Sequence, residues 1–313
     1  MHPPRAPGRG TRRLGACLLP LFFSAAIFLA GCSSKGSDSP ASTPTSSTAA
    51  GPTTTSPPSI FDGTFKGATL SSAWIGVVGS NPSNGEQECY SSTNETVGSG
   101  VLKETAVVGS VAANCNCPPS PASDSLCPYA SGAVQWSSLG FTYGTISVRA
   151  KLAGGVGTWP AIWLLGTECR TSITPDVVGW IGTGASCPWP AQGANEIDIA
   201  EIQPAPIGNP AVVNEAVHTT DPSGAKVNEG CGSEPVSACP GNAPGWHTYT
   251  LVWAPGSLTW EIDGKSTYSL TQDVPSTPMF LIINTAVGGT GVTVDNATLP
   301  QTTEISSVKV TGP

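Results

Sequence analysis

The chain has 313 residues, of which 11% are charged, and a formal net charge of −8 at pH 7. Binding of nucleic acid needs clustered Lys and Arg that displace counterions from phosphates. With 13 basic residues against 21 acidic ones, the chain lacks that pattern, whereas a neutral polymer is compatible with its charge. The 37 glycines and 30 prolines favour many short strands joined by tight turns over a helical bundle.

The first 31 residues have the pattern of an export signal. Four arginines precede residue 14, and an apolar stretch covers residues 14–30. It ends in Leu-Ala-Gly-Cys at residues 29–32, which resembles the lipobox of bacterial lipoproteins, in which the cysteine carries the lipid. The alternatives are an ordinary signal peptide or a transmembrane anchor, although about 17 apolar residues interrupted by Pro20 are short for a span. We expect an exported protein, attached to the cell-envelope membrane by a lipid on Cys32 or secreted.

Residues 32–58 differ in composition from both neighbours. They are almost wholly Ser, Thr, Pro, Ala and Gly and include no aromatic residue, so they have little to bury. A flexible tether is therefore expected, which is common to surface lipoproteins and indicates no particular chemistry. Residues 59–313 are predicted to form one domain.

Eight cysteines remain after Cys17 of the signal and Cys32 are set aside, and an even number in an exported chain predicts disulfides. Cys169 with Cys187, and Cys231 with Cys239, are local pairs that would bracket loops. Metal binding is the competing interpretation for Cys115 and Cys117, although no histidine lies near them in the sequence. The other two cysteines are Cys89 and Cys127.

Alternation of apolar and polar residues predicts antiparallel strands in this domain. Gly140 separates two such runs, and Asp263-Gly264 supplies the positive φ that a tight hairpin turn requires. No βαβ rhythm and no fixed repeat are present, so we predict an all-β sandwich. The predicted strands are 131–138, 142–152, 247–253, 258–262, 267–270, 279–287 and 304–310.

Residues 196–201 carry three carboxylates within six positions. In a regular strand Glu196 and Asp198 share a face, whereas Glu201 would point to the other side. A β-bulge at Ile199-Ala200 inserts one residue and returns Glu201 to the carboxylate face. The two glutamate Cα atoms would then lie about 13 Å apart. Side chains that lean together could reach the carboxyl separation of about 5–5.5 Å that retaining glycosidases use.

A solvated strand face is the alternative interpretation of these acids. Like charges on one strand face destabilise it, and no Lys or Arg intervenes here. The pattern therefore favours catalysis, in which one carboxylate attacks an anomeric carbon and the other acts as acid and base. Asp198 between them would keep their pKa values apart.

The run Glu-Ile-Asp-Ile-Ala-Glu at 196–201 resembles the Glu-x-Asp-x-x-Glu signature of glycoside hydrolase family 16, in its bulged, laminarinase-like form. The resemblance covers nearly all of 59–313. It implies a β-jelly-roll sandwich of two antiparallel sheets, in which the concave sheet forms an open cleft. The further segments that match in family order are 85–90, 143–152, 157–166, 189–193, 217–219, 246–249, 262–264 and 281–289.

The resemblance also implies roles for single residues. Glu196 is the expected nucleophile, Asp198 its assisting partner and Glu201 the general acid/base. Tryptophans in these segments would face sugar rings, although core packing is an equally ordinary use of a tryptophan, and a lone strand histidine is often structural. The residues expected to bind substrate are Trp159, Trp163, Trp189, His218, Asn284, Arg149 and Glu86.

Two departures from the family pattern bear on cofactors and specificity. Many relatives bind a structural calcium through an Asp in the last strand, but the matching run here begins with Ser306-Ser307. We therefore expect no required cofactor and regard calcium as doubtful. The insertion between Cys169 and Cys187 is expected to shape one end of the cleft.

The expected activity is that of a retaining endo-β-glucanase acting on β-1,3- or mixed 1,3/1,4-glucan. Hydrolysis of a galactan such as agar or carrageenan, transglycosylation on the same fold, and non-catalytic glucan binding are the alternatives. The last is disfavoured because all three acids are present. A polysaccharide substrate, attachment to a membrane through the lipid, a monomeric state and no nucleic-acid partner complete the expectations.

Overall fold

The computed structural model describes residues 58–81, 84–109, 127–138, 140–170, 177–178, 187–191, 193–233 and 238–313. The chain divides into two units, Met1–Thr54 and Thr55–Pro313, and every described residue belongs to the second. The predicted signal, nearly all of the tether, Cys32, Cys115 and Cys117 lie outside the described residues. Within the described part, no helix is long and apolar enough to cross a membrane.

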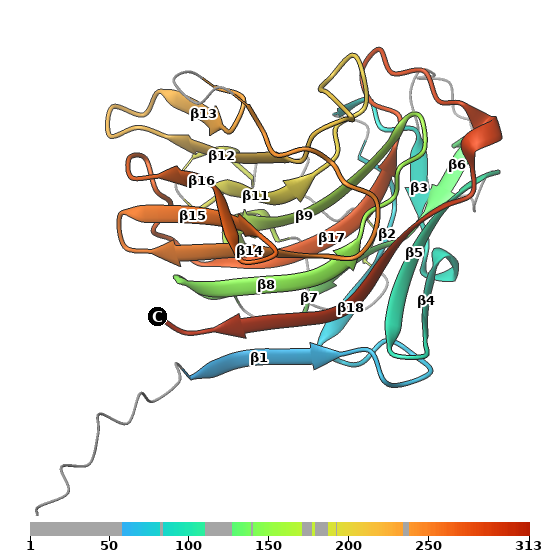
Figure 1. Cartoon of the computed structure of the whole chain (residues 1–313), viewed down its shortest axis with the longest axis horizontal. Coiled ribbons are helices and arrows are strands. Elements are labelled where there is room, and N and C mark those ends of the chain that lie inside the picture. Colours follow the sequence, from blue (N-terminus) through green and yellow to red (C-terminus); the bar gives the residue numbers. More distant parts are fainter. Residues whose placement is uncertain are drawn as a thin grey trace, which may run out of the picture. The chain divides into compact units, whose positions relative to one another are not determined.

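The described residues form two sheets, which Figure 1 shows as two layers. The strands of the first sheet are β1 (Ser59–Thr64), β3 (Glu88–Tyr90), β4 (Glu95–Gly98), β5 (Val101–Val108), β6 (Tyr129–Ser131), β8 (Gly144–Lys151), β14 (His247–Ala254), β15 (Ser257–Ile262), β16 (Lys265–Leu270) and β18 (Gln301–Thr311). They lie in the order β16-β15-β14-β8-β18-β5-β6-β3, with β1 beside β18 and β4 beside β5.

The second sheet carries the carboxylate strand. Its strands are β2 (Trp74–Val78), β7 (Ala133–Trp136), β9 (Thr158–Gly166), β10 (Val177–Val178), β11 (Glu196–Glu201), β12 (Asn214–Thr220), β13 (Lys226–Gly230) and β17 (Met279–Val287). Their order is β10-β2-β7-β17-β9-β11-β12-β13. Three short 3₁₀ turns are also described: η2 (Ser92–Asn94), η3 (Thr167–Cys169) and η4 (Asn296–Thr298).

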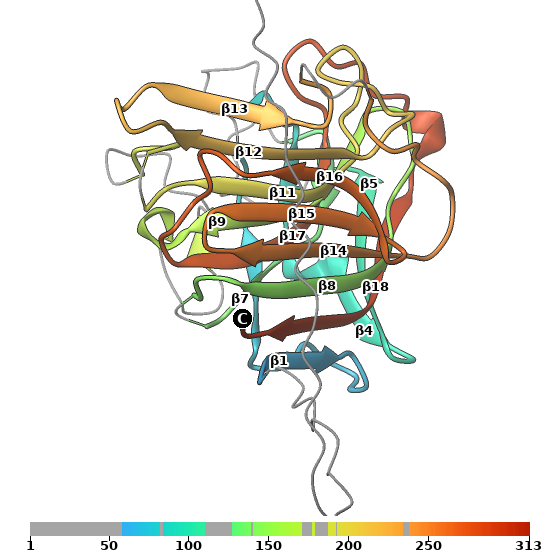
Figure 2. The same cartoon turned by 60° about the vertical axis from the view of Figure 1, so that its left-hand side comes forward.

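The main core lies between the two layers, which Figure 2 shows from a second direction. Period-two alternation puts Ile146 and Val148 of β8 into it from one side and Ile197 and Ile199 of β11 from the other. Each fully buried aliphatic side chain contributes about 1.5–3 kcal/mol. The predicted all-β sandwich is confirmed.

Local predictions on turns and cysteines are confirmed as well. Asp263 and Gly264 have φ values of 51° and 73° at the turn between β15 and β16. Cys169 is bonded to Cys187 and Cys231 to Cys239. Cys89 and Cys127 are also disulfide-bonded.

Candidate active site

The bulge predicted in the carboxylate strand is present in β11. Asp198 pairs with Ala216 of β12, but the next pair on that side joins Glu201 to Asn214. Three steps along β11 therefore match two along β12, and the register with β9 shifts between Asp198 and Ala200. The extra residue gives Glu196 and Glu201 the same facing despite their odd spacing.

The two faces of β11 have different surroundings because of this bulge. Ile197, Ile199 and Ala200 belong to the core between the sheets. Glu196, Asp198 and Glu201 lie on the opposite face, where the residues directly across on β9 are Leu165, Trp163 and Ala161, respectively. Glu201 is 8% exposed and Asp198 2% exposed, so the acids line a largely dehydrated surface.

The core side of the bulge is fixed by a tryptophan of the other sheet. The indole Nε1 of Trp260 on β15 donates to the backbone carbonyl of Asp198 at 2.8 Å. A bulge interrupts the ladder and leaves backbone groups that need another partner. Trp260 supplies one and ties the opposite sheet to the carboxylate strand.

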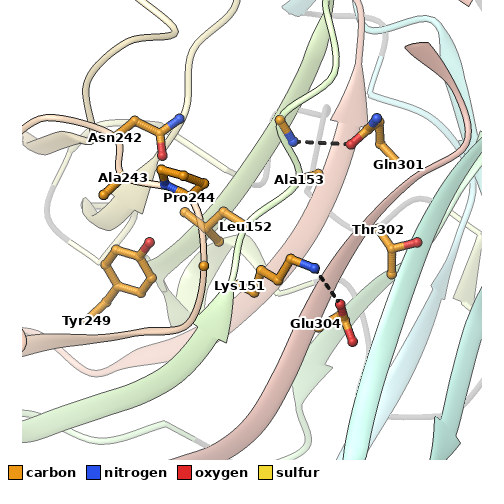
Figure 3. A pocket seen from close by; sticks show the side chains of 12 residues that line it. Lys151, Leu152, Ala153, Asn242, Ala243, Pro244, Tyr249, Gln301, Thr302 and Glu304 are labelled. Carbon is orange, nitrogen blue, oxygen red and sulfur yellow. Dashed lines mark hydrogen bonds and ion pairs between the residues drawn. The ribbon is translucent and has the colours of Figure 1, made fainter. Parts of the chain in front are cut away.

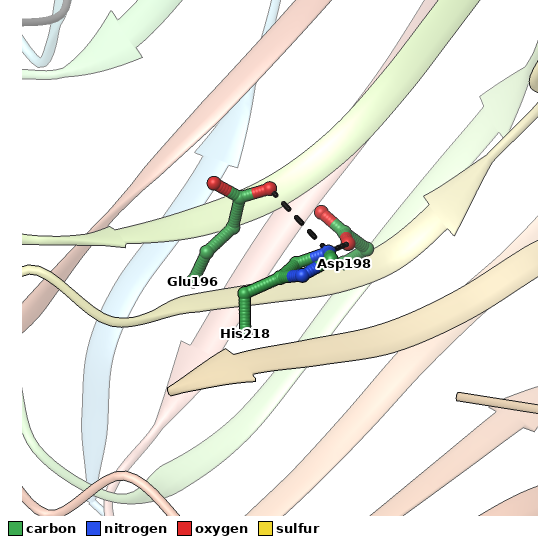
Figure 4. A group of neighbouring side chains, drawn as sticks. All are labelled: Glu196, Asp198 and His218. Atoms are coloured by element: carbon green, nitrogen blue, oxygen red, sulfur yellow. Dashed lines mark hydrogen bonds and ion pairs between the residues drawn. The ribbon is translucent and has the colours of Figure 1, made fainter. Parts of the chain in front are cut away.

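His218 on β12 lies directly across from Glu196 and between two of the acids (Figure 4). Its Nε2 lies 3.1 Å from Asp198 Oδ2 and 3.9 Å from Glu196 Oε1, and its Nδ1 lies 2.8 Å from Asn228 Oδ1. Burial lowers the pKa of His218, but the hydrogen bond and charge of Asp198 outweigh it and raise the value to about 10. The ring is therefore an imidazolium at neutral pH that donates from both nitrogens.

Glu196 receives a second polar contact from the other end of its carboxyl group. The indole Nε1 of Trp189 donates to Glu196 Oε2 at 2.8 Å. Burial and the charge of Asp198 raise the pKa of Glu196 to about 8, while the charge of His218 and the Trp189 bond oppose that rise. Burial followed by the charge of Glu201 likewise raises the pKa of Asp198. Glu196 and Asp198 thus hold a proton between them more readily than two exposed acids would.

Glu201 has a separate set of donors. Trp159 Nε1 donates to Oε1 at 2.5 Å, whereas Gln203 Nε2 and Asn214 Nδ2 donate to Oε2 at 2.8 Å and 3.0 Å. Burial raises the pKa of Glu201, and the bonds from Asn214 and Trp159 lower it. A carboxyl group with a raised pKa is suited to deliver a proton near neutral pH.

The three predicted tryptophans differ in exposure. Trp163 is buried, Trp159 is half-buried, and Trp189 is 40% exposed. The ring of Trp189 lies 5.6 Å from that of His218, and Lys226 Nζ lies 5.4 Å from its centre. Trp189 and Trp159 therefore each have an accessible indole ring and donate a hydrogen bond to one of the two glutamates of β11.

Asn284 and Glu86 belong to a buried network next to these acids. Trp163 Nε1 donates to Asn284 Oδ1 at 2.8 Å, Asn284 Nδ2 donates to Tyr90 OH at 3.0 Å, and Tyr90 OH donates to Glu86 Oε2 at 3.3 Å. Asn284 and Glu86 are 4% and 3% exposed, and burial raises the pKa of Glu86. Their contacts therefore support Trp163, which lies directly across from Asp198 on β9, and direct contact of Asn284 and Glu86 with substrate stays a prediction.

Arg149 is the predicted site residue that the structure does not bring to the acids. It lies on β8 of the other sheet and is exposed, because its neighbours Val148 and Ala150 point into the core. Its guanidinium contacts Thr248 Oγ1 at 3.4 Å. Alternation along β8 thus directs Arg149 away from the sheet that carries Glu196.

A pocket of about 540 Å³ lies apart from these residues, where β8 ends and β18 begins (Figure 3). None of the predicted site residues lines it. Several of its polar side chains are hydrogen-bonded to their neighbours, as in the bond from Lys151 Nζ to Glu304 Oε1 at 3.1 Å. The remaining lining residues are Leu152, Ala153, Gly154, Asn242, Ala243, Pro244, Gly245, Tyr249, Gln301 and Thr302.

Glu196, Asp198 and His218 also form a group whose ligand-type atoms lie within 4.8 Å of one another. Those atoms are occupied in the bonds that join the three residues to each other and to Trp189. The chemistry of this set is that of a proton-sharing cluster.

The sequence interpretation missed five residues of the site. Gln203 and Asn214 left a signal in the sequence, because an amide side chain close to a carboxylate strand is a potential donor to its acids. The others act from distant segments, which one sequence does not connect. The five are Gln203, Asn214, Asn228, Tyr90 and Trp260.

Comparisons with known proteins agree with this geometry. The family model described as glycosyl hydrolases family 16 matches residues 122–307. A β-glucanase of Rhodothermus marinus is 33% identical over 162 residues, which are 48% of this chain and 49% of that protein. A keratan-sulfate endo-1,4-β-galactosidase of Sphingobacterium multivorum is 29% identical over 199 residues, which are 60% of this chain and 41% of that protein. The chain thus spans less than half the length of these two relatives.

Among solved structures, a LamA variant from Zobellia galactanivorans in complex with laminaritriose and laminaritetraose has a similar fold. The TM-score is 0.63 at 26% identity, and the match covers 81% of this chain and 98% of the other.

Proposed function

Because the chain belongs to glycosyl hydrolases family 16, we propose that it is a retaining endo-β-glucanase that cleaves β-1,3- or mixed 1,3/1,4-glucan by double displacement. The observation that carries the proposal is the bulge in β11, which turns Glu196, Asp198 and Glu201 to one face of the sheet. The likeness to a LamA structure with bound laminaritriose and laminaritetraose supports a glucan as substrate.

In the first step, Glu196 attacks the anomeric carbon while Glu201 gives its proton to the departing glycosidic oxygen. Attack requires the ionised form of Glu196, which the imidazolium of His218 and the indole N–H of Trp189 stabilise. As Glu196 attacks, the proton that the pair shares passes to Asp198, so that Glu196 carries the charge. The products are a glycosyl ester on Glu196 and a shortened chain.

In the second step, Glu201 acts as a base on a water molecule, which attacks the anomeric carbon of the glycosyl ester from the side the leaving group vacated. The C1–O bond to Glu196 breaks, and Glu201 ends the cycle protonated again. Two inversions at the same carbon retain its configuration. The half-buried and exposed indoles of Trp159 and Trp189 offer apolar faces to the sugar rings.

A galactan hydrolase is the second candidate, and the 29% identical keratan-sulfate galactosidase favours it. The purified protein should be incubated with laminarin, lichenan, agarose, carrageenan and keratan sulfate, and the products separated by chromatography. We expect short oligosaccharides from laminarin or lichenan. Release from a galactan alone would establish the second candidate, and longer chains than the starting ones would indicate transglycosylation. No turnover of any polymer would contradict both.

We also propose export with a lipid on Cys32 and action as a monomer that needs no cofactor. The lipobox-like run at 29–32 supports the anchor. Mass spectrometry of the mature N-terminus should find a diacylglyceryl group on Cys32, and light scattering should give the monomer mass. A mature chain that begins at another residue would contradict the anchor.

The residues of β18 do not fit the calcium that many family members bind. Ser306 stands where the resemblance places an Asp, and its hydroxyl donates to the backbone carbonyl of Arg149 at 3.4 Å. Hard cations prefer carboxylate and carbonyl oxygens. Ser306 offers a hydroxyl instead of a carboxylate, and the Arg149 carbonyl beside it already accepts a hydrogen bond. The melting temperature should therefore be the same with and without a chelator. A large fall with EDTA would show that calcium is bound after all.

A further inference from the structure

The two oxygens of Glu201 are held differently. Oε2 accepts two amide N–H groups, from Gln203 at 2.8 Å and from Asn214 at 3.0 Å. Oε1 accepts one indole N–H, from Trp159 at 2.5 Å. The amides reach Oε2 from separate segments, since Gln203 follows β11 by two residues and Asn214 pairs with Glu201 from β12.

A carboxylate oxygen offers two lone-pair positions in the plane of the group. Both positions on Oε2 are used by the amides, whereas on Oε1 the indole is the single donor among the described residues, so one position remains beside it. A proton on Oε2 would need one amide to leave. A proton on Oε1 keeps every contact.

We propose that Gln203 and Asn214 are positioning residues that keep Oε2 unprotonated and so assign the acid proton of Glu201 to Oε1. The inference rests on the proposed function, because it concerns the general acid/base of that reaction. Neither residue contacts the other two acids of β11 through a hydrogen bond that the structure describes.

The assignment has a consequence for each step of the reaction. When the glycosidic oxygen takes the proton from Oε1, the O–H bond breaks, and the negative charge that develops on Glu201 strengthens the two amide bonds. When water attacks the ester, Oε1 accepts the water proton and the amides stay in place. Oε1 therefore loses the proton in the first step and regains one in the second, without rotation of the carboxyl group.

The amides are one of several influences on the pKa of Glu201. Burial and the charge of Glu196 favour its neutral form, and the charge of His218 favours the ionised form. Asp198 is the third charged neighbour, and the charge of Glu201 raises the pKa of Asp198. Donors to Oε2 stabilise the ionised form, so removing one raises the pKa of Glu201.

The test compares the pH dependence of kcat/KM in the intact protein and in Asn214→Leu and Gln203→Leu. The first step needs protonated Glu201, so its loss of a proton sets the alkaline limb. We expect each variant to move that limb upward by about 0.5–1 pH unit, because one hydrogen bond to the ionised form is lost. The value of kcat should fall about tenfold, with KM changed less than about twofold, because the proton is aimed less well.

Asn214→Asp sharpens the test, because it replaces the donor by a second negative charge next to Oε2. Its alkaline limb should lie above that of Asn214→Leu. The matched control is Asn242→Leu, since Asn242 Nδ2 donates to the Pro210 carbonyl at 3.1 Å, away from the acids. The control should keep the pH profile of the intact protein.

The outcomes separate this inference from the proposed function. If Glu201→Gln retains full turnover of polysaccharide, the acid/base role itself is wrong. If Glu201→Gln is inactive but the Leu variants keep the original alkaline limb, the positioning role is wrong and the amides only stabilise the fold, which a lower melting temperature would register. An upward shift in both Leu variants and a larger one in Asn214→Asp would establish the assignment.

Discussion

The described residues bury carboxyl groups in several places, and two of these places, on β11 and β5, have different surroundings. On β11, Glu196, Asp198 and Glu201 accept hydrogen bonds from indoles, amides and an imidazolium. On β5, Glu104 is fully buried opposite Glu95 of β4, and among the described residues its oxygens make no hydrogen bond of ordinary geometry. Burial raises the pKa of Glu104, the charge of Glu95 adds to the rise, and the backbone of Val134 offsets part of it.

A raised pKa does not by itself mark an active site. The pKa is raised in both places by burial first. On β11 side-chain donors stabilise the ionised forms, so that these acids can exchange protons during a reaction. Glu104 is held neutral by a site that offers its charge little stabilisation.

The largest effect should come from Glu196→Gln. The amide keeps the shape and the Trp189 contact but cannot form the glycosyl ester, so turnover should fall by more than about 10³-fold. Circular dichroism and the melting temperature should be close to those of the intact protein. Turnover at the original rate would refute the nucleophile assignment and remove the contrast with Glu104.

Trp260→Phe sharpens the comparison, because only the β11 acids depend on a bulge. Loss of the bond to the Asp198 carbonyl should cost about 1–2 kcal/mol of unfolding free energy and lower kcat about tenfold as the acids shift. Trp253→Phe is the control, since its Nε1 also donates to a buried carbonyl, that of Pro275, at 2.9 Å. Both variants should lose similar stability in denaturant unfolding. If kcat fell equally in Trp260→Phe and Trp253→Phe, the contact at the bulge would have no special role in catalysis.

His218→Gln removes the cation that offsets the charges on β11. The charge of His218 lowers the pKa of Glu196, so its loss raises that pKa and moves the acid limb of kcat/KM to higher pH. His247→Gln is the matched control, because His247 pairs with Asp263 at 2.7 Å away from the acids. An acid limb that stays in place in His218→Gln would argue against an imidazolium at this position.

Glu104→Leu should leave activity unchanged and should increase the free energy of unfolding. Because the folded pKa of Glu104 is raised, its stabilising contribution is present below the unfolded pKa and is lost as pH rises through the folded pKa. The variant should therefore gain about 1–3 kcal/mol at neutral pH and least near pH 4.

Urea unfolding of Glu104→Leu at the two pH values gives both numbers. The control is Glu304→Gln, whose ion pairs with Lys103 and Lys151 are exposed and worth less than about 1 kcal/mol. A Glu104→Leu variant that unfolds more easily than the intact protein would mean that Glu104 has a stabilising partner.

Sequence predicted the features of this molecule that follow from local periodicity. Alternation was sufficient to predict the sandwich and the bulge at Ile199-Ala200. Spacing was sufficient to predict the disulfides of Cys169 and Cys231. The same periodicity directs Arg149 outward, against the expectation that came from its place in a family-like run. Alternation along a strand is therefore the stronger guide to facing.

The contacts that cross the fold were not predictable in this way. Asn284 and Glu86 lie in family-like segments with residues expected to bind substrate, yet the Tyr90 hydroxyl that joins them lies in a different strand from Asn284. Trp260 reaches the bulge from the opposite sheet. Such contacts depend on how the layers stack, which no local pattern reports.

The most direct test of the account is to identify the covalent intermediate. The protein should be reacted with an activated 2-deoxy-2-fluoro β-glycoside of the sugar that the polysaccharide screen selects, digested and analysed by mass spectrometry. The account predicts one glycosyl group, attached to Glu196 and absent from Glu196→Gln. A group attached to Asp198 or Glu201, or steady turnover of that glycoside with no attached group, would contradict it.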